Sequence, residues 1–296
     1  MNVEPALARV SPSLGRNEVQ KDVAAYYDAK TEGILRRYGP GPRVHYHSGL
    51  VDDMPPPGLT AQALRVRIHD SQELLLREMS YAVSESWAGK QVLDVGCGLG
   101  GGSLYWATEH RAHVTAITIA PAHVPLVQRF AAQAGVADRV RVLLCDALEV
   151  PGSDYFDRVV AVESSCYLPR PAWFQQLHRL LRPGGTVVLM DCFLGRPELA
   201  GPFDRYWRTR IGTTDEYLRA ASQAGLELEL YQDLAYRTVN FWTLTMDLMA
   251  REQEEWAPQS PARSARPVSQ REHLRLQQAM LDGGLQYALM VLRRRR

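Results

Sequence analysis

QVLDVGCGLGGG, at residues 91–102, is the stretch that decides the fold. It begins with a short apolar run typical of a buried parallel strand, and a glycine turn and a segment that can be helical follow. Glycines at positions 96, 98 and 100 let the backbone adopt a positive φ and pass close to a ligand. Asp94 lies inside the strand, before the first glycine. The stretch predicts a strand–turn–helix unit with a ligand at the turn; a purely structural turn is the alternative.

The composition is that of an ordinary globular protein. Hydrophobic residues make up 46% and charged residues 23% of the 296 positions, enough for one large domain or one domain with a cap. The formal net charge of +1 argues against nucleic acid or an anionic membrane as a partner. We find no apolar run of about 18 residues and no signal-peptide pattern. The cysteines at 97, 145, 166 and 192 form no CxxC pair, so we expect reduced thiols in a cytoplasmic protein.

Strands and helices alternate after the opening stretch. We expect strands at residues 91–95, 113–119, 140–145, 156–162 and 186–192, and helices at 102–109, 122–134 and 170–181. This alternation predicts an α/β fold, a doubly wound Rossmann-like sheet with helices on both faces. Ligands bind at the carboxyl ends of such strands.

Segments on either side of this core have other patterns. Residues 1–85 are predicted to form an N-terminal arm and a helical lid, with helices at 19–38 and 59–84, and residues 86–296 the sheet domain. After the fifth strand the alternation stops, and residues from about 194 to 215 are expected to form an inserted helical cap. Further helices are expected at 215–225, 239–256 and 269–281, strands at 226–230 and 285–292, and a polar loop at 257–267. The arm and the helix at 239–256 favour a homo-oligomer.

The string Val-Leu-Asp-Val-Gly-Cys-Gly-x-Gly resembles the first motif of class I S-adenosylmethionine (SAM) methyltransferases. The resemblance implies SAM as cofactor, with Asp94 near its amino acid part, Asp146 at the adenine amino group and Ala147 near the ring. Many members carry an acid after the second strand, whereas this chain has Thr118-Ile119. For both aspartates, capping the following backbone is the alternative. The expected cofactor residues are Asp94, Gly96, Gly98, Gly100, Thr118, Ile119, Asp146 and Ala147.

Glu163, which leaves the strand at 156–162, is a candidate base beside the methyl donor. Binding the SAM amino group and capping the next helix are the alternatives. The run Glu163-Ser164-Ser165-Cys166-Tyr167 is similar to the Glu-Ser-Ser-Met-Tyr of geranyl diphosphate C-methyltransferases. Further similar stretches lie at residues 45–49, 215–220, 241–242 and 282–289, so the resemblance covers the chain from about residue 40 onward.

This narrower resemblance implies a C-methyltransferase that acts on an alkene carbon of a prenyl substrate, a prenyl diphosphate in the first instance. Methylation of an alkene creates a carbocation, which needs an aromatic wall and a base. The resemblance assigns the cation to Trp207 with its neighbour Tyr206, adds Tyr46 and Tyr27 as walls, and assigns the final proton to Glu163. Each aromatic residue taken alone is more often part of a core.

The head group of the substrate is left open. Ala161-Val162 stand where these enzymes have Asn-Asn, used near diphosphate and Mg²⁺, so a metal requirement does not follow. His45, His47 and the arginines at 205, 208 and 210 are candidates for an anion. We expect His45 and His47 to hydrogen-bond rather than to bind metal, because no third ligand is near in the sequence. The alternatives to C-methylation are O- or N-methylation of a small natural product and a SAM-binding cyclase of terpenes.

Overall fold

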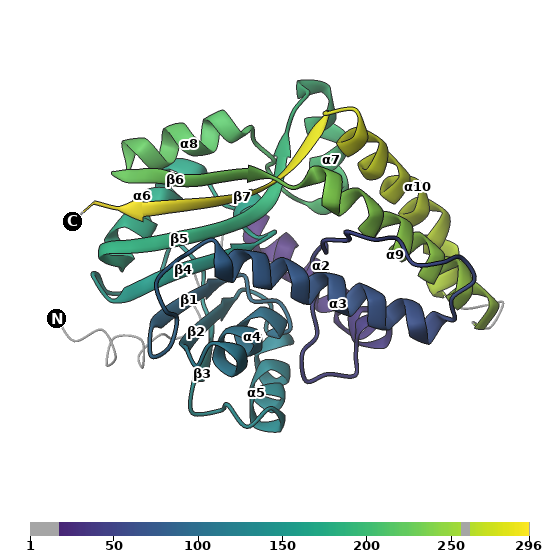
Figure 1. Ribbon diagram of the computed structural model, residues 1–296, viewed down its shortest axis with the longest axis horizontal. Coiled ribbons are helices and arrows are strands. Elements are labelled where there is room, and N and C mark those ends of the chain that lie inside the picture. Colours follow the sequence, from purple (N-terminus) through teal and green to yellow (C-terminus); the bar gives the residue numbers. More distant parts are fainter. Residues whose placement is uncertain (1–17, 256–260, 296) are drawn as a thin grey trace.

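The computed structural model describes residues 18–255 and 261–295. The predicted arm, up to residue 17, lies outside the described residues. A seven-stranded sheet forms the centre, in the order β3-β2-β1-β4-β5-β7-β6 (Figure 1). The strands are β1 (Gln91–Val95), β2 (His113–Thr118), β3 (Val140–Leu144), β4 (Phe156–Val162), β5 (Leu181–Leu194), β6 (Leu226–Asp233) and β7 (Leu285–Arg294). β7 runs antiparallel to both of its neighbours, and the strands from β3 to β5 are mutually parallel. The predicted α/β class is confirmed.

Helices cover both faces of this sheet. α3 (Ala61–Tyr81), α4 (Gly101–Glu109) and α5 (His123–Gln133) share one core with alternate strand residues such as Val92 and Val160. α6 (Arg170–Leu180) and α8 (Thr214–Gln223) share the other core with the intervening residues Leu93 and Val159. This division follows from the period of two along a strand, which sends neighbouring side chains to opposite faces. The sheet is therefore doubly wound.

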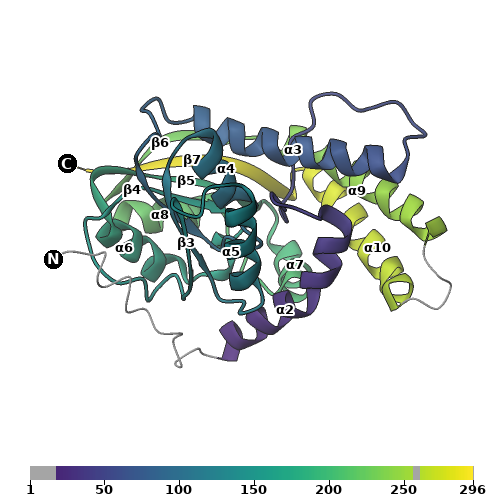
Figure 2. The same ribbon diagram turned by 90° about the horizontal axis from the view of Figure 1, so that it is seen from below.

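The remaining helices gather beyond the carboxyl ends of the parallel strands. These helices are α2 (Glu18–Tyr38), α7 (Ala200–Trp207), α9 (Ala235–Glu255) and α10 (Pro261–Leu281). Figure 2 shows them at one end of the molecule, and α9 and α10 lie side by side there. Short 3-10 turns, η1 (Ser165–Tyr167) and η2 (Pro197–Leu199), lead into this region. Together, these helices and turns enclose the edge of the sheet at which ligands of such folds bind.

Several predicted boundaries are wrong; α9, for example, begins at Ala235 rather than at residue 239. The polar loop expected over 257–267 is wrong from residue 261 onward, because α10 begins at Pro261, and proline is well suited to the first turn of a helix. Residues 257–260 lie outside the described residues. β5 begins at Leu181 rather than at residue 186, with an irregularity in its pairing to β4 between Phe156 and Arg158. α8 begins as expected: Thr213 is its N-cap and forms a capping box with Glu216.

Among the described residues, no helix combines the length and the apolar character needed to cross a membrane.

Candidate active site

A first cavity of about 210 Å³ lies at the carboxyl ends of β1, β2 and β3. Gly96 lines it at the end of β1 with a φ of 72°. A Cβ atom on Gly96 would lie 2.6 Å from Cβ of Ser164, so glycine alone allows β1 and the residues after β4 to approach this closely. The cavity thus sits between neighbouring strands β1 and β4, where the order of the sheet reverses, the usual ligand site of a doubly wound fold.

Most of the residues expected around the cofactor line this cavity: Gly96, Gly98, Thr118, Ile119, Asp146 and Ala147. Gly100 does not; it precedes α4 with a φ of 84°, and a Cβ on it would lie 2.9 Å from Cγ1 of Val127. Asp94 does not line it either. Its carboxylate accepts a hydrogen bond from the Ser103 hydroxyl, and burial raises the pKa of Asp94 to about 6. The structure thus places Asp94 as a side-chain partner of α4.

The residues that line the first cavity suit SAM in their chemistry. Gly98 also has a positive φ, and a Cβ on it would meet no other atom within 4 Å, so the loop leaves open space there. Asp146 is buried, and its Oδ1 accepts the N–H of Leu148, which fixes the carboxylate in the cavity wall. Apolar atoms of Ile119 and Ala147 lie beside it, as the edge and face of an adenine require.

A second cavity, of about 490 Å³, lies next to the first and is walled by aromatic rings. The rings come from α2, α7 and α9 and from the segments at 46 and 167: Tyr27, Tyr38, Tyr46, Tyr167, Phe203, Tyr206, Trp207, Phe241 and Trp242. All four aromatic residues expected around the cation, Trp207, Tyr206, Tyr46 and Tyr27, therefore lie around one space. α10 closes it with Ser269, His273 and Leu276.

The aromatic wall is held by hydrogen bonds as well as by packing. The rings of Tyr206 and Trp207 meet edge to face at a centroid distance of 4.8 Å, and Tyr27 meets Tyr46 in the same way at 6.3 Å. The hydroxyls of Tyr27 and Tyr167 are 2.7 Å apart, and Tyr167 donates to the carbonyl oxygen of Trp207. The lid helix and the cap helix α7 are thereby joined through Tyr167.

Glu163 lies between the two cavities and lines both. Its Oε1 atom accepts the backbone N–H of Ser48 and the hydroxyl of Tyr287, each at 2.8 Å. Among the described residues nothing donates to Oε2, so one carboxylate oxygen is held and the other has its lone pairs available. Glu163 has a φ of 48°, a left-handed conformation that costs free energy in a residue other than glycine and is concentrated at functional sites.

The two serines after Glu163 hold it in place. Ser164 donates to the carbonyl oxygen of Val95, the last residue of β1, at 2.6 Å. Ser165 donates its backbone N–H to Asp191 of β5 at 3.0 Å, and its hydroxyl bonds the same oxygen. The Glu-Ser-Ser run therefore ties the end of β4 to the strand on each side.

His47 also lines both cavities. Its Nδ1 donates to the carbonyl oxygen of Ser48 at 2.7 Å, whereas Nε2 is buried and has no hydrogen-bond partner in the described part of the chain. Burial lowers the pKa of His47 to about 4, so the ring is neutral at pH 7 and Nε2 carries a lone pair.

The cations of the second cavity differ from those we expected. Arg205 and Arg208 are exposed and line neither cavity, and Arg210 borders the first one. The lysine and arginine side chains that line the second cavity are instead those of Lys30, Arg36 and Arg37 of α2. Burial lowers the pKa of Lys30 to about 8, and Arg37 forms an ion pair with the buried Glu252 at 3.1 Å.

Sequence reasoning missed several residues of the site. Tyr287 belongs to the stretch at 282–289 that is similar to the prenyl enzymes, but the similarity alone assigns it no role. Ser48 acts through its backbone, which no side-chain pattern reveals. Trp242 and His273 line the second cavity from α9 and α10; Trp242 belongs to the similar stretch at 241–242, which assigns it no role, and no pattern marks His273.

Comparison with known proteins identifies the family. The protein-family model described as "Methyltransferase domain" matches residues 92–185 of this chain. The chain is 37% identical over 167 residues to a 27-O-demethylrifamycin SV methyltransferase of Amycolatopsis mediterranei, covering 53% of this chain and 61% of that protein. It is 30% identical over 174 residues to O-methyltransferase rstn1 of Aspergillus nomiae, covering 56% of this chain and 77% of the relative.

Solved structures agree on the fold. Geranyl diphosphate C-methyltransferase from Streptomyces coelicolor, in complex with Mg²⁺, geranyl-S-thiolodiphosphate and S-adenosyl-L-homocysteine, superposes with a TM-score of 0.81 at 20% identity, over 96% of this chain and 99% of that one. The [4+2]-cyclase SpnF superposes with a TM-score of 0.73 at 20% identity, over 93% and 96% of the two chains. The chain belongs to the SAM-dependent methyltransferases and has their class I fold.

Proposed function

We propose that the protein is a C-methyltransferase that methylates an alkene carbon of a prenyl substrate, with Glu163 as the base. The observation that carries this proposal is the position of Glu163, which lines both the first cavity, assigned to SAM, and the aromatic cavity. A base placed there reaches the substrate on the side where the methyl group arrives. The geranyl diphosphate C-methyltransferase fold and the matched motifs around Glu163 and Tyr287 support the same assignment.

The residues of the site have separate roles in the proposed reaction. SAM, when bound, supplies an electrophilic methyl group. The π electrons of the alkene form the new C–C bond, the S–C electrons stay on sulfur, and a positive charge develops on the neighbouring substrate carbon. The faces of Trp207 and Tyr46 stabilise this charge and exclude water. Glu163 then removes a proton from an adjacent carbon, whose C–H electrons restore the double bond.

Positively charged side chains of α2 would bind a diphosphate head group. Lys30, Arg36 and Arg37 line the same cavity as the aromatic rings. An apolar wall with cations on one helix suits a chain that is apolar at one end and anionic at the other. If Mg²⁺ accompanies the substrate, the oxygens of the diphosphate itself are its natural ligands.

The proposal is tested by incubating the protein with labelled SAM and isopentenyl, geranyl or farnesyl diphosphate, or prenylated aromatics. Mass analysis should show a prenyl product heavier by one methylene, and Glu163→Gln should abolish it while SAM still binds. Label found only on oxygen or nitrogen acceptors would overturn the carbocation mechanism.

O-methylation is the second candidate, and two observations favour it. Both of the sequence relatives described above act on oxygen according to their names. In addition, the free Nε2 of neutral His47 lines both cavities and is suited to accept the proton of a hydroxyl group. With that chemistry His47→Asn, rather than Glu163→Gln, would be the variant that abolishes methyl transfer.

A further inference from the structure

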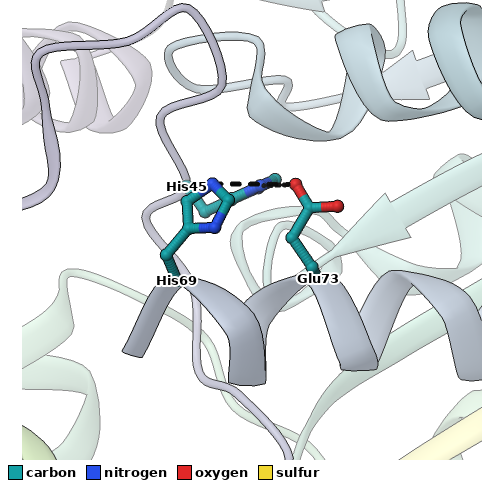
Figure 3. Close-up of side chains that lie close together, drawn as sticks. All are labelled: His45, His69 and Glu73. Atoms are coloured by element: carbon teal, nitrogen blue, oxygen red, sulfur yellow. Dashed lines mark hydrogen bonds and ion pairs between the residues drawn. The ribbon is translucent and has the colours of Figure 1, made fainter. Parts of the chain in front are cut away.

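Three side chains that could bind a metal ion meet on the lid, beside the first cavity, which His45 also lines. His69 and Glu73 stand one turn apart on α3, so their side chains share one face of the helix. His45 comes from the segment before α3 and meets them there (Figure 3). Its Nε2 lies 2.8 Å from Oε1 of Glu73, and Nε2 of His69 lies 3.7 Å from the same oxygen. The three ligand atoms all lie within 4.8 Å of one another.

This arrangement differs from the histidine pair that the sequence suggested. His47 points to the carbonyl oxygen of Ser48 and lines the cavities, so it is not a partner of His45 in binding a metal. The third ligand that the sequence lacked near His45 is supplied instead by α3. Only the fold brings these residues together, because 28 positions separate His45 from Glu73.

We propose that His45, His69 and Glu73 bind one divalent transition-metal ion of the zinc type. Two imidazoles and one carboxylate form a ligand set that Zn²⁺ favours, whereas Mg²⁺ prefers oxygen ligands. Three protein ligands leave a fourth tetrahedral position for water. The site is thus distinct in chemistry from any Mg²⁺ that a diphosphate would bring.

An ion can reach this cluster, and Glu73 can give up its present ion pair with Arg43 to bind it. The side chain of His69 is 39% exposed and that of Glu73 is 20% exposed, whereas that of His45 is buried. Glu73 also borders a surface cleft, which gives a path for a hydrated ion. Arg43 lies 3.3 Å from Oε1 of Glu73, but it bonds Glu109 at 2.7 Å as well. Arg43 therefore keeps an acidic partner when the metal takes Glu73.

The position of the site gives it a structural consequence. Ser48, three residues after His45, donates its N–H to Glu163, and His47 lines both cavities. An ion held by His45 and α3 would fix one end of this segment. We therefore expect the metal to position the segment that holds Glu163, and its binding does not depend on which methylation reaction the protein performs.

The test uses the full chain without an affinity tag, freed of metal by chelation and then dialysed against Zn²⁺ or Co²⁺. Elemental analysis should give one Zn²⁺ per chain, and Co²⁺ should give the visible absorption of a tetrahedral site. His69→Ala and Glu73→Gln should each weaken binding by more than the roughly 10–100-fold that loss of an outer-shell partner costs. Both positions are partly exposed, so the variants should fold, which circular dichroism verifies.

A control variant separates a built site from incidental binding. His113→Ala removes an exposed histidine at the start of β2, and it should keep full binding. Absence of stoichiometric Zn²⁺, or unchanged affinity in a His69→Ala/Glu73→Gln double variant, would overturn the proposal. These readouts need no methyl transfer, so their failure is distinct from failure of the proposed function.

Discussion

The hydroxyl of Tyr287 donates a hydrogen bond to Oε1 of Glu163 at 2.8 Å, across 124 positions of the chain. Tyr287 is fully buried on β7, the antiparallel strand, and Glu163 directly follows the parallel strand β4. Because Ser48 donates to the same oxygen, the two donors orient the carboxylate from two sides. The antiparallel strand thus contributes to the site as well as to the sheet.

Removal of the Tyr287 hydroxyl should lower kcat and leave KM nearly unchanged. A hydrogen bond to a charged group is worth about 1.5–3 kcal/mol, so Tyr287→Phe should reduce kcat roughly 10–100-fold. The matched control is Tyr231→Phe on the adjacent strand β6, where the side chain is exposed. Steady-state kinetics with saturating SAM measures both variants. An unchanged kcat in Tyr287→Phe would show that Ser48 alone suffices to orient the carboxylate.

Gly96 should be the least replaceable glycine of the turn. In Gly96→Ala the new methyl would lie 2.6 Å from Cβ of Ser164, in addition to the strain of a positive φ. Gly89 has nearly the same φ, +71°, but a Cβ there would meet nothing within 4 Å, so Gly89→Ala measures the strain alone. Such strain costs about 1–3 kcal/mol. Urea unfolding should show a larger loss for Gly96→Ala, and calorimetry should show weaker SAM binding in that variant only.

The central strands were predictable because their patterns are local. β1 and β4 begin and end at the predicted residues, since each is an apolar run stopped by a glycine turn or by Glu163. The start of α10 was not predictable, because its first residues, rich in proline, serine and arginine, have the composition of a loop. Propensity is a weak guide where neighbouring helices decide the outcome.

The site was predictable where residues follow a strand directly and unpredictable where they arrive from elsewhere. Thr118 and Asp146 follow β2 and β3, so the topology alone places them at the cavity. The cations were predicted on the cap segment near residue 207, yet Lys30 and Arg37 of the lid helix line the second cavity. One sequence cannot show which face of α2 turns inward relative to α7.

Buried, neutral His47 should make the protein less stable in acid. Its pKa falls from 6.5 to about 4 on folding, so between these values the unfolded chain binds the extra proton. Stability therefore falls as the pH drops from about 6.5 toward 4, by at most about 1.4 kcal/mol per pH unit for one group. His47→Asn, whose amide N–H can still reach the Ser48 carbonyl, should flatten that slope in denaturant unfolding between pH 7 and 5. The same slope in wild type and variant would show that the ring is solvated.

Substitution of Trp207 should distinguish C-methylation from O-methylation, because only C-methylation passes through a carbocation that needs an aromatic face. Its ring lines the second cavity, and a desolvated cation–π contact is worth about 2 kcal/mol or more. Trp207→Ala should therefore slow C-methylation roughly 30-fold or more, and Trp207→Phe should recover much of the rate. The control Tyr236→Ala removes an exposed ring from α9. Equal losses for the Ala and Phe variants would indicate that shape, rather than the aromatic face, is what the substrate needs.

The charge of Lys30 should make the binding of a diphosphate head group depend on pH. Burial lowers the pKa of Lys30 from 10.5 to about 8, so the ammonium is charged at pH 7 and largely neutral at pH 9. Because Lys30 lines the second cavity, KM for a prenyl diphosphate should rise as the pH passes through about 8. Lys30→Arg should remove that rise, since a guanidinium keeps its proton in this range, and Lys30→Met should raise KM at every pH. A neutral prenylated acceptor should show none of these effects, so a flat KM profile for the true substrate would point to an uncharged one.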